Sequence, residues 1–128
     1  MSYNYKKEIL VKKYGARWTA SKTDKQVMAI YDSHIDANLD RFISDLVDYL
    51  KAYQKGYVFA IVTYQLQEQK TILNFNILVT SPDETIKTST TFKYRTGFLF
   101  DNNYNYFDIL KDINKEVKEN YEKDKEEK

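Results

Sequence analysis

Between Tyr57 and Arg95 the chain alternates apolar and polar residues in three runs that are rich in strand-forming residues. A period of two is typical of strands that bury one face. The breaks between the runs fall at Gln67–Glu68 and at Ser81–Glu84, where a proline suits a type I turn. The pattern predicts an antiparallel sheet whose third strand spans Thr85–Arg95.

The register of these strands follows from the requirement that apolar side chains share one face. We expect the core face to contain Val58, Ala60, Val62, Tyr64, Leu73, Phe75, Ile77, Val79, Ile86, Thr88, Thr90, Phe92 and Tyr94. The second face then contains Tyr57, Phe59, Ile61, Thr63, Gln65, Lys70, Ile72, Asn74, Asn76, Leu78, Lys87, Ser89, Thr91, Lys93 and Arg95. This register needs an even loop at Gln67–Glu68. A three-residue loop would bury Asn74 and Asn76, at about 1–3 kcal/mol each if they are unpaired.

The second face is not uniform along the sheet. Its third strand is polar and basic, whereas its first strand is apolar at Tyr57, Phe59 and Ile61. Two arrangements fit this pattern. Either the N-terminal segment folds over the apolar residues, which we favour, or they form an exposed patch used for binding.

Two helices are predicted by apolar residues at three- and four-residue spacing. The first is expected over residues 33–55, with Gly56 at its C-terminal end, and the second over residues 107–121. Residues 122–128 are almost all charged, and we expect them to fray.

The first 31 residues give a weaker pattern, and we predict strands at Glu8–Tyr14 and Gln26–Tyr31. The fold class is therefore α+β. We expect a single domain over residues 1–121, with an antiparallel sheet of three to five strands packed on one face by the two helices.

The composition excludes some classes of chemistry. The chain has no cysteine, so disulfides, thiolate catalysis and cysteine-ligated zinc are excluded. There is no apolar leader and no apolar run of membrane-spanning length. We therefore expect a cytoplasmic protein with no membrane partner.

The remaining signals of catalysis are weak. The single histidine, His34, is flanked by Asp32 and Asp36, and Asp36 and Asp40 are four residues apart, but both patterns are common on exposed acidic helices. Three scattered glycines form no phosphate-binding loop. We expect no enzyme, no cofactor and no metal.

The net charge of +1 is unevenly distributed, with a basic segment near the N-terminus and an acidic one at residues 32–48. This asymmetry indicates either solvated surfaces or an electrostatic binding site. The basic arm supplies candidate nucleic-acid contacts: Lys6, Lys7, Lys12, Lys13 and Arg17. The order helix, three strands, helix resembles that of double-stranded RNA-binding domains. The lysine-rich start of the second helix expected in that family is missing, so no residues are carried over.

Protein binding fits the remaining features better. The segment Gly97–Tyr106 combines aromatic residues with asparagine, as binding surfaces often do. Alternatively, its phenylalanines fold back into the core. The candidate partner-binding residues are Lys87, Lys93, Arg95, Asn74, Asn76, Phe98, Tyr104 and Tyr106.

The leading hypothesis is a non-enzymatic protein that docks on a macromolecular partner, most simply a protein. Frequent Lys, Asn, Tyr and Ile suggest an AT-rich genome. The most concrete version is a phage or mobile-element inhibitor of a host or defence enzyme (anti-CRISPR-like), or a toxin-immunity protein. The alternative is a nucleic-acid-binding accessory protein that uses the basic arm and the polar sheet face.

Overall fold

The computed structural model describes residues 2–53, 58–100 and 104–126, with side chains at all of these except 2, 58–63, 104 and 105. The elements follow in the order α1 (Ser2–Tyr14), α2 (Ala16–Ala20), α3 (Asp24–Tyr53), β1 (Val58–Gln67), β2 (Ile72–Thr80), β3 (Lys87–Arg95), the 3-10 helix η1 (Thr96–Phe100) and α4 (Tyr104–Glu126). The strands form one antiparallel sheet in the order β1-β2-β3. The predicted α+β class is confirmed, with three strands and four α-helices in the described part of the chain.

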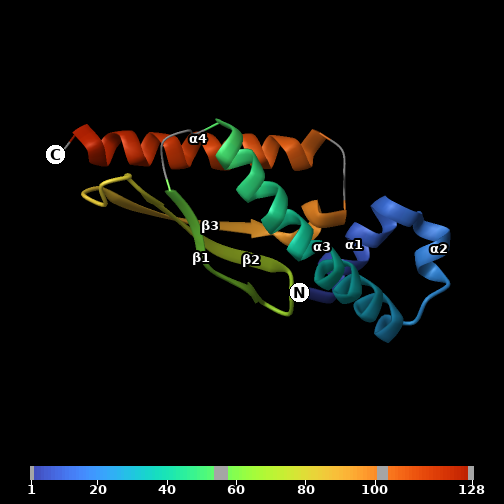
Figure 1. The fold of residues 1–128 in the computed structure, drawn as a ribbon. Helices are drawn as coiled ribbons and strands as arrows, with labels where there is room; N and C mark the ends of the chain where they lie inside the picture. Colours follow the sequence, from blue (N-terminus) through green and yellow to red (C-terminus); the bar gives the residue numbers. More distant parts are fainter. Residues whose placement is uncertain (1, 54–57, 101–103, 127–128) are drawn as a thin grey trace.

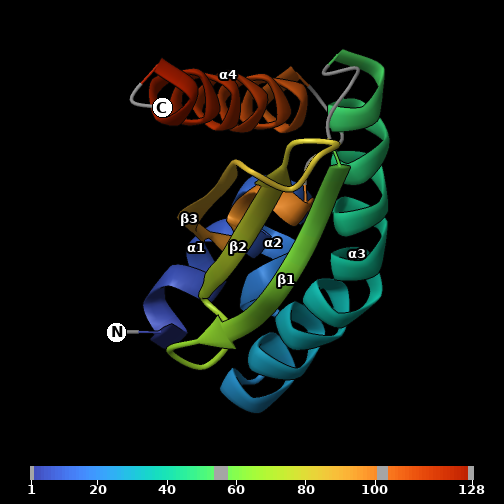
Figure 2. The ribbon, with the colours of Figure 1, turned by 60° about the vertical axis from the view of Figure 1, so that its left-hand side comes forward.

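The two long helices cover one face of the sheet. α4 packs on β3 and β2, and α3 packs on β1 and on α4 (Figures 1 and 2). Phe42 of α3 joins these layers, because its ring lies 5.8 Å from that of Phe75 on β2 and 6.0 Å from that of Tyr106 on α4. The hydrophobic core therefore lies between the sheet and these two helices.

α3 is longer than predicted and begins at Asp24. A capping box precedes it, in which the Thr23 hydroxyl accepts from the Gln26 backbone N–H and the Gln26 side chain accepts from the Thr23 N–H. Val27 and Tyr31 are buried on the same stripe as Ile35. The predicted strand at Gln26–Tyr31 is therefore wrong.

The predicted strand at Glu8–Tyr14 is also wrong, since this segment belongs to α1. Its sequence gives little helical periodicity because one of its buried positions is a lysine, Lys6, which shares a face with the buried Leu10. Gly15 follows α1 with a φ of 97°, a conformation that favours glycine, and lets the chain turn into α2.

α4 extends beyond both predicted ends. Residues 122–126 continue this helix, where Tyr121 is buried and Asp124 accepts a hydrogen bond of 2.7 Å from the Thr88 hydroxyl on β3. These contacts hold the last turns of the helix against the sheet.

The register confirms the predicted faces of β2 and β3, where buried and more exposed positions alternate. The loop between β1 and β2 is even, as predicted, but it contains the four residues Glu68–Thr71. The register of β1 differs, because an extra residue at Val62 interrupts the ladder. Phe59 and Ile61, expected on the second face, occupy positions opposite Val79 and Ile77 of the core face.

The same shift moves Val58 and Ala60 to positions opposite Thr80 and Leu78, on the second face. The N-terminal segment does not cover this face as predicted. α1 instead packs on α3, α2 and η1, at the end of the molecule remote from the C-terminus (Figure 1). Tyr57, Gly56 and residues 101–103 lie outside the described residues.

Candidate functional site

The side of the sheet that faces away from α3 and α4 presents an open surface on β2 and β3, here called the outer face. It consists of five cross-strand pairs: Ile72 with Arg95, Asn74 with Lys93, Asn76 with Thr91, Leu78 with Ser89, and Thr80 with Lys87. All five β3 members are exposed and the β2 members are half-buried. The outer face is therefore accessible chiefly along β3.

Hydrogen bonds fix the centre of the outer face. Asn76 donates to the Thr91 hydroxyl over 2.9 Å and accepts from the Ser89 hydroxyl over 2.8 Å. Its amide is thereby oriented, and each amide atom keeps capacity for one further hydrogen bond. The predicted binding residue Asn76 therefore lies on the outer face in a fixed orientation.

The charge of the outer face has one sign. Lys87, Lys93 and Arg95 supply three cations, and none of the five pairs contains an acidic residue. Within the described part of the chain none of these cations forms an ion pair. An unneutralised row of this kind favours an acidic binding partner.

A cleft of about 810 Å³ adjoins this face at Arg95 and lies between α1, η1 and α4. It is lined by Tyr5, Ile9, Lys12, Lys13, Arg95, Gly97, Phe98, Phe100, Asp108 and Ile109. The structure thus brings together four residues singled out in the sequence: Lys12, Lys13, Arg95 and Phe98. Gly97 and Phe100 belong to the predicted segment Gly97–Tyr106, whereas Tyr5 and Ile9 of α1 and Asp108 and Ile109 of α4 were not predicted.

Gly97 permits the close approach of α1 that forms one wall of the cleft. Its backbone N–H donates to the Tyr5 hydroxyl oxygen over 2.8 Å. A Cβ at this position would lie 2.5 Å from that oxygen and 2.7 Å from Cδ1 of Ile9. The guanidinium of Arg95 lies 5.0 Å from the centre of the Tyr5 ring, so Tyr5 also supports a cation at the cleft.

Two further predicted binding residues lie in the interior. Lys6 is 1% exposed and its ammonium group donates to Asp32 over 2.8 Å. Tyr106 is 6% exposed and donates to Asp45 over 2.6 Å. Burial and this hydrogen bond to Asp45 raise the pKa of Tyr106. Neither residue contributes to an accessible surface.

The other predicted residues lie elsewhere. Lys7 and Arg17 are exposed, but they do not line the cleft. Phe98 is half-buried against Phe42 and Tyr94, and Phe100 is buried. The phenylalanines therefore fold back into the core, which was the alternative considered above. The side chain of Tyr104 lies outside the described residues.

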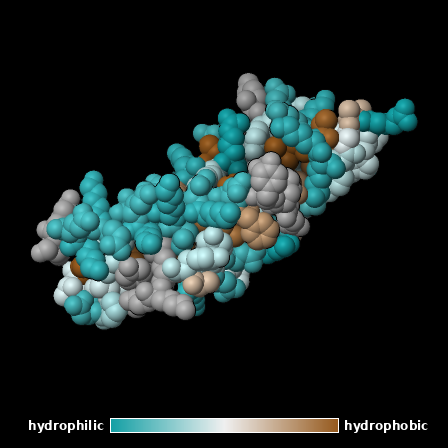
Figure 3. Space-filling view, turned by 90° about the horizontal axis from the view of Figure 1, so that it is seen from above, coloured by the Kyte–Doolittle hydropathy of each residue, from teal (hydrophilic) through white to brown (hydrophobic). Residues whose placement is uncertain are grey.

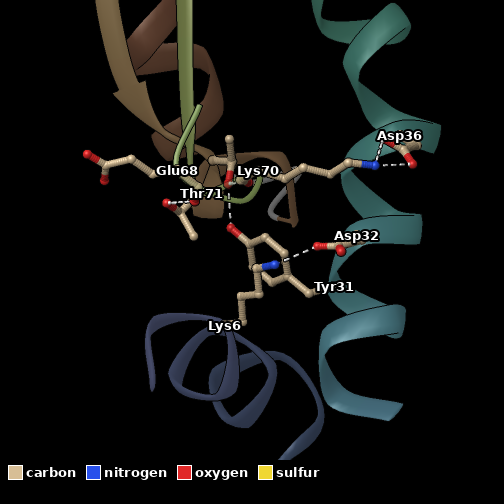
Figure 4. A network of polar contacts seen from close by, with 8 residues as sticks. Lys6, Tyr31, Asp32, Asp36, Glu68, Lys70 and Thr71 are labelled. Carbon is tan, nitrogen blue, oxygen red and sulfur yellow. Dashed lines mark hydrogen bonds and ion pairs between the residues drawn. The ribbon is translucent and has the colours of Figure 1, made fainter. Parts of the chain in front are cut away.

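A polar network joins α1, α3 and the end of the sheet (Figure 4). The Thr96 hydroxyl donates to the carbonyl oxygen of Lys70, so its oxygen accepts from the Tyr31 hydroxyl. Lys70 itself pairs with Asp36 over 2.8 Å. Burial raises the pKa of Tyr31, because the phenolate would lose its hydration. These polar groups have their partners within the protein, and the contacts between them hold together the elements that frame the cleft.

His34 does not act together with the neighbouring aspartates. Its Nε2 lies 2.7 Å from the Tyr14 hydroxyl, while Asp32 pairs with Lys6 and Asp36 pairs with Lys70. Burial and the positive charge of Lys13 lower the pKa of His34. No group of three or more metal-ligating side chains occurs in the ranges that the structure describes.

Across the described helices, none combines the length and apolarity needed to cross a membrane. Comparison with protein-family models, with curated proteins and with solved structures gives no match. The class of protein therefore has to be argued from the outer face and the cleft.

Proposed function

We propose that this chain is a non-enzymatic binding protein that docks on an acidic surface of a protein partner through the outer face of its sheet. Proteins of this class act by occupying a surface of their target. An inhibitor of a host or defence enzyme, encoded by a phage or mobile element, and a toxin-immunity protein are the concrete forms of this proposal.

The observation that carries the proposal is the row of cations along β3. Lys87, Lys93 and Arg95 project from alternate positions of one exposed strand, with no carboxylate in the five cross-strand pairs. The sheet fixes the backbone positions from which these side chains project, so binding requires no ordering of the backbone. Their main contribution is to speed association and to select an acidic partner.

The described surface of α4 lacks this property. Seen from the side of α4, the molecule is largely hydrophilic over this helix (Figure 3). Lysines and glutamates there occur together in one shallow region, lined by Lys115, Lys118, Glu119, Glu122, Lys123 and Glu126. Interspersed charges of both signs are typical of a solvated surface.

Nucleic-acid binding is a second candidate, because Lys12 and Lys13 of α1 line the same cleft as Arg95 of β3. This arrangement extends the basic surface beyond the sheet. The outer face of β2 and β3 contains no aromatic residue on which a base could stack. We therefore place this candidate second.

The test uses a charge reversal on the outer face, Lys87→Glu with Lys93→Glu. The matched control is Lys115→Glu with Lys118→Glu on α4, which makes the same change of charge on exposed positions. A partner captured by the wild-type chain is purified, and its affinity for each variant is measured at low and at physiological salt. We expect the outer-face variant to lose about tenfold or more in affinity at low salt, and less at high salt.

Equal affinities for the two variants would contradict the proposal. Fluorescence anisotropy with single- and double-stranded oligonucleotides forms the second arm. Tight, salt-steep binding of an oligonucleotide that is lost in Lys12→Gln with Lys13→Gln would favour the second candidate instead.

A further inference from the structure

The cleft beside Arg95 has properties that a flat docking surface does not need. Its volume of about 810 Å³ lies within the range of small-molecule sites, roughly 300–1,000 Å³. Phe98, Phe100, Ile9 and Ile109 supply apolar walls, and the charged side chains come from three different elements. A concave, mostly apolar site with a few fixed polar groups is the usual form of a ligand pocket.

Two of the cleft's cations, Lys13 and Arg95, are oriented by contacts with the protein. Lys13 donates to the carbonyl oxygen of Phe100 over 3.0 Å, and the guanidinium of Arg95 rests over the Tyr5 ring. Neither cation forms an ion pair with any residue that the structure describes. Lys12 is less constrained, since its only described ion pair joins it to Glu8 over 3.6 Å on the same helix.

We propose that this cleft binds a small aromatic anion, a ring that carries a phosphate or carboxylate group. The ring packs against Phe98, Phe100 and Ile9, and the anionic group meets Arg95 and Lys13. An arginine fork matches the oxygens of either group, and its fixed position reduces the entropy lost on binding. The cleft shares only Arg95 with the outer face, so this proposal does not depend on the proposed docking function.

Asp108 is expected to weaken the binding of an anion in the cleft. Among the lining residues that the structure describes it is the only acidic one, and its charge opposes an anion there. The three lining cations outweigh it, so the described lining carries a net positive charge. Replacing Asp108 should therefore strengthen binding, which is the opposite of the effect expected for the cations.

The test is an NMR titration of the isotope-labelled chain with phenyl phosphate and with benzoate. Phenol supplies the ring without the charge, and inorganic phosphate supplies the charge without the ring. We expect the amide signals of Ile9, Gly97 and Ile109 to shift with phenyl phosphate or benzoate. Binding should be at least about tenfold tighter than for phenol or inorganic phosphate, because each of these lacks one of the two interactions.

Five variants complete the test. Arg95→Gln and Lys13→Gln should each weaken binding by about tenfold, and Asp108→Asn should strengthen it. Lys87→Gln, at the far end of β3, removes the same charge outside the cleft and should leave binding unchanged. Arg95→Lys keeps the positive charge without the guanidinium fork and should bind with intermediate affinity. The amide spectrum of each variant shows whether it is folded.

Absence of a response to both aromatic anions at millimolar concentration would overturn the proposal. So would equal weakening by Lys87→Gln and Arg95→Gln. Binding of the dipeptide acetyl-Asp-Phe-amide without binding of either small anion would also overturn it, and would assign the cleft to a segment of the protein partner. A failure here leaves the charge-reversal result on the outer face intact, so the two proposals are distinguished.

Discussion

The ammonium group of Lys6 lies 2.8 Å from the carboxylate of Asp32, and the two residues differ in burial: Lys6 is 1% exposed and Asp32 is 35% exposed. The lysine also lies 5.5 Å from the centre of the Tyr31 ring. Loss of Asp32 would leave a buried cation without its counter-charge. Loss of Lys6 would leave a carboxylate that water can reach.

We therefore predict that Asp32→Ala lowers the free energy of unfolding by about 3 kcal/mol. Lys6→Met keeps the packing of the side chain and should cost less than about 1.5 kcal/mol. Asp36→Ala, on the same helix, removes an exposed pair with Lys70 and should cost at most about 1 kcal/mol. Urea unfolding measures all three, and a loss for Lys6→Met as large as that for Asp32→Ala would contradict the argument.

Gly97→Ala is predicted to loosen α1 while the sheet and α3 remain packed. The added methyl group would push Tyr5 and Ile9 away, and it would break the hydrogen bond from the Gly97 N–H. Overpacking of this kind costs about 1–3 kcal/mol. Hydrogen exchange should become faster in α1 but not in β2.

Gly15→Ala is not a suitable control because of its positive φ, so Thr91→Ala on the outer face serves instead. Unchanged hydrogen exchange in α1 would contradict this prediction, because it would show that α1 accommodates the added methyl group without losing stability.

Stability is predicted to fall steeply above about pH 10. Burial raises the pKa values of Tyr31 and Tyr106 above the ordinary tyrosine value of about 10. A raised folded-state pKa contributes stability that is fully present below the unfolded-state value and is lost as pH rises towards the folded-state value. Urea unfolding at pH 8 and pH 11 should show a smaller loss in Tyr31→Phe and Tyr106→Phe than in the wild type.

The exposed Tyr64→Phe is the control for removal of one hydroxyl group. An identical loss of stability in all four chains would show that other groups cause the alkaline destabilisation.

Asp83 in the turn between β2 and β3 is predicted to titrate unusually low. Its carboxylate accepts from the Ser81 hydroxyl over 2.7 Å and from the hydroxyl and N–H of Thr85. These hydrogen bonds lower the pKa of Asp83 to about 2. Because the folded-state pKa is lowered, this stabilisation is present above the unfolded-state value and is lost as pH falls towards 2.

The carboxyl signal of Asp83 in an NMR titration reports this value directly. Ser81→Ala should raise the midpoint, whereas Thr91→Val removes a distant hydroxyl and should not. A midpoint near 4 in the wild type would mean that the turn is not held by Asp83 in solution.

Part of the fold could be predicted because the sequence patterns that indicate it lie within single helices and strands. The alternation in β2 and β3 identifies their two faces, since the more apolar side of each strand is the buried one. The start of α3 also has a local signal, the capping-box spacing of Thr23 and Gln26. β1 gives no such signal. Its run from Val58 to Val62 is apolar at every position, so the sequence fits the register before or after the extra residue equally well.

The sequence by itself determined the sheet faces of β2 and β3, most of α3 and α4, and the exclusion of cysteine chemistry. It did so because periodicity and composition depend on neighbouring residues. Only the tertiary structure decided that Lys6 and Tyr106 are buried while Lys12, Lys13 and Arg95 meet at one cleft. That cleft depends on contacts between residues far apart in the chain, such as Lys13 and Phe100, which are 87 positions apart. No local pattern records such a contact, because it forms only when α1 and η1 pack together.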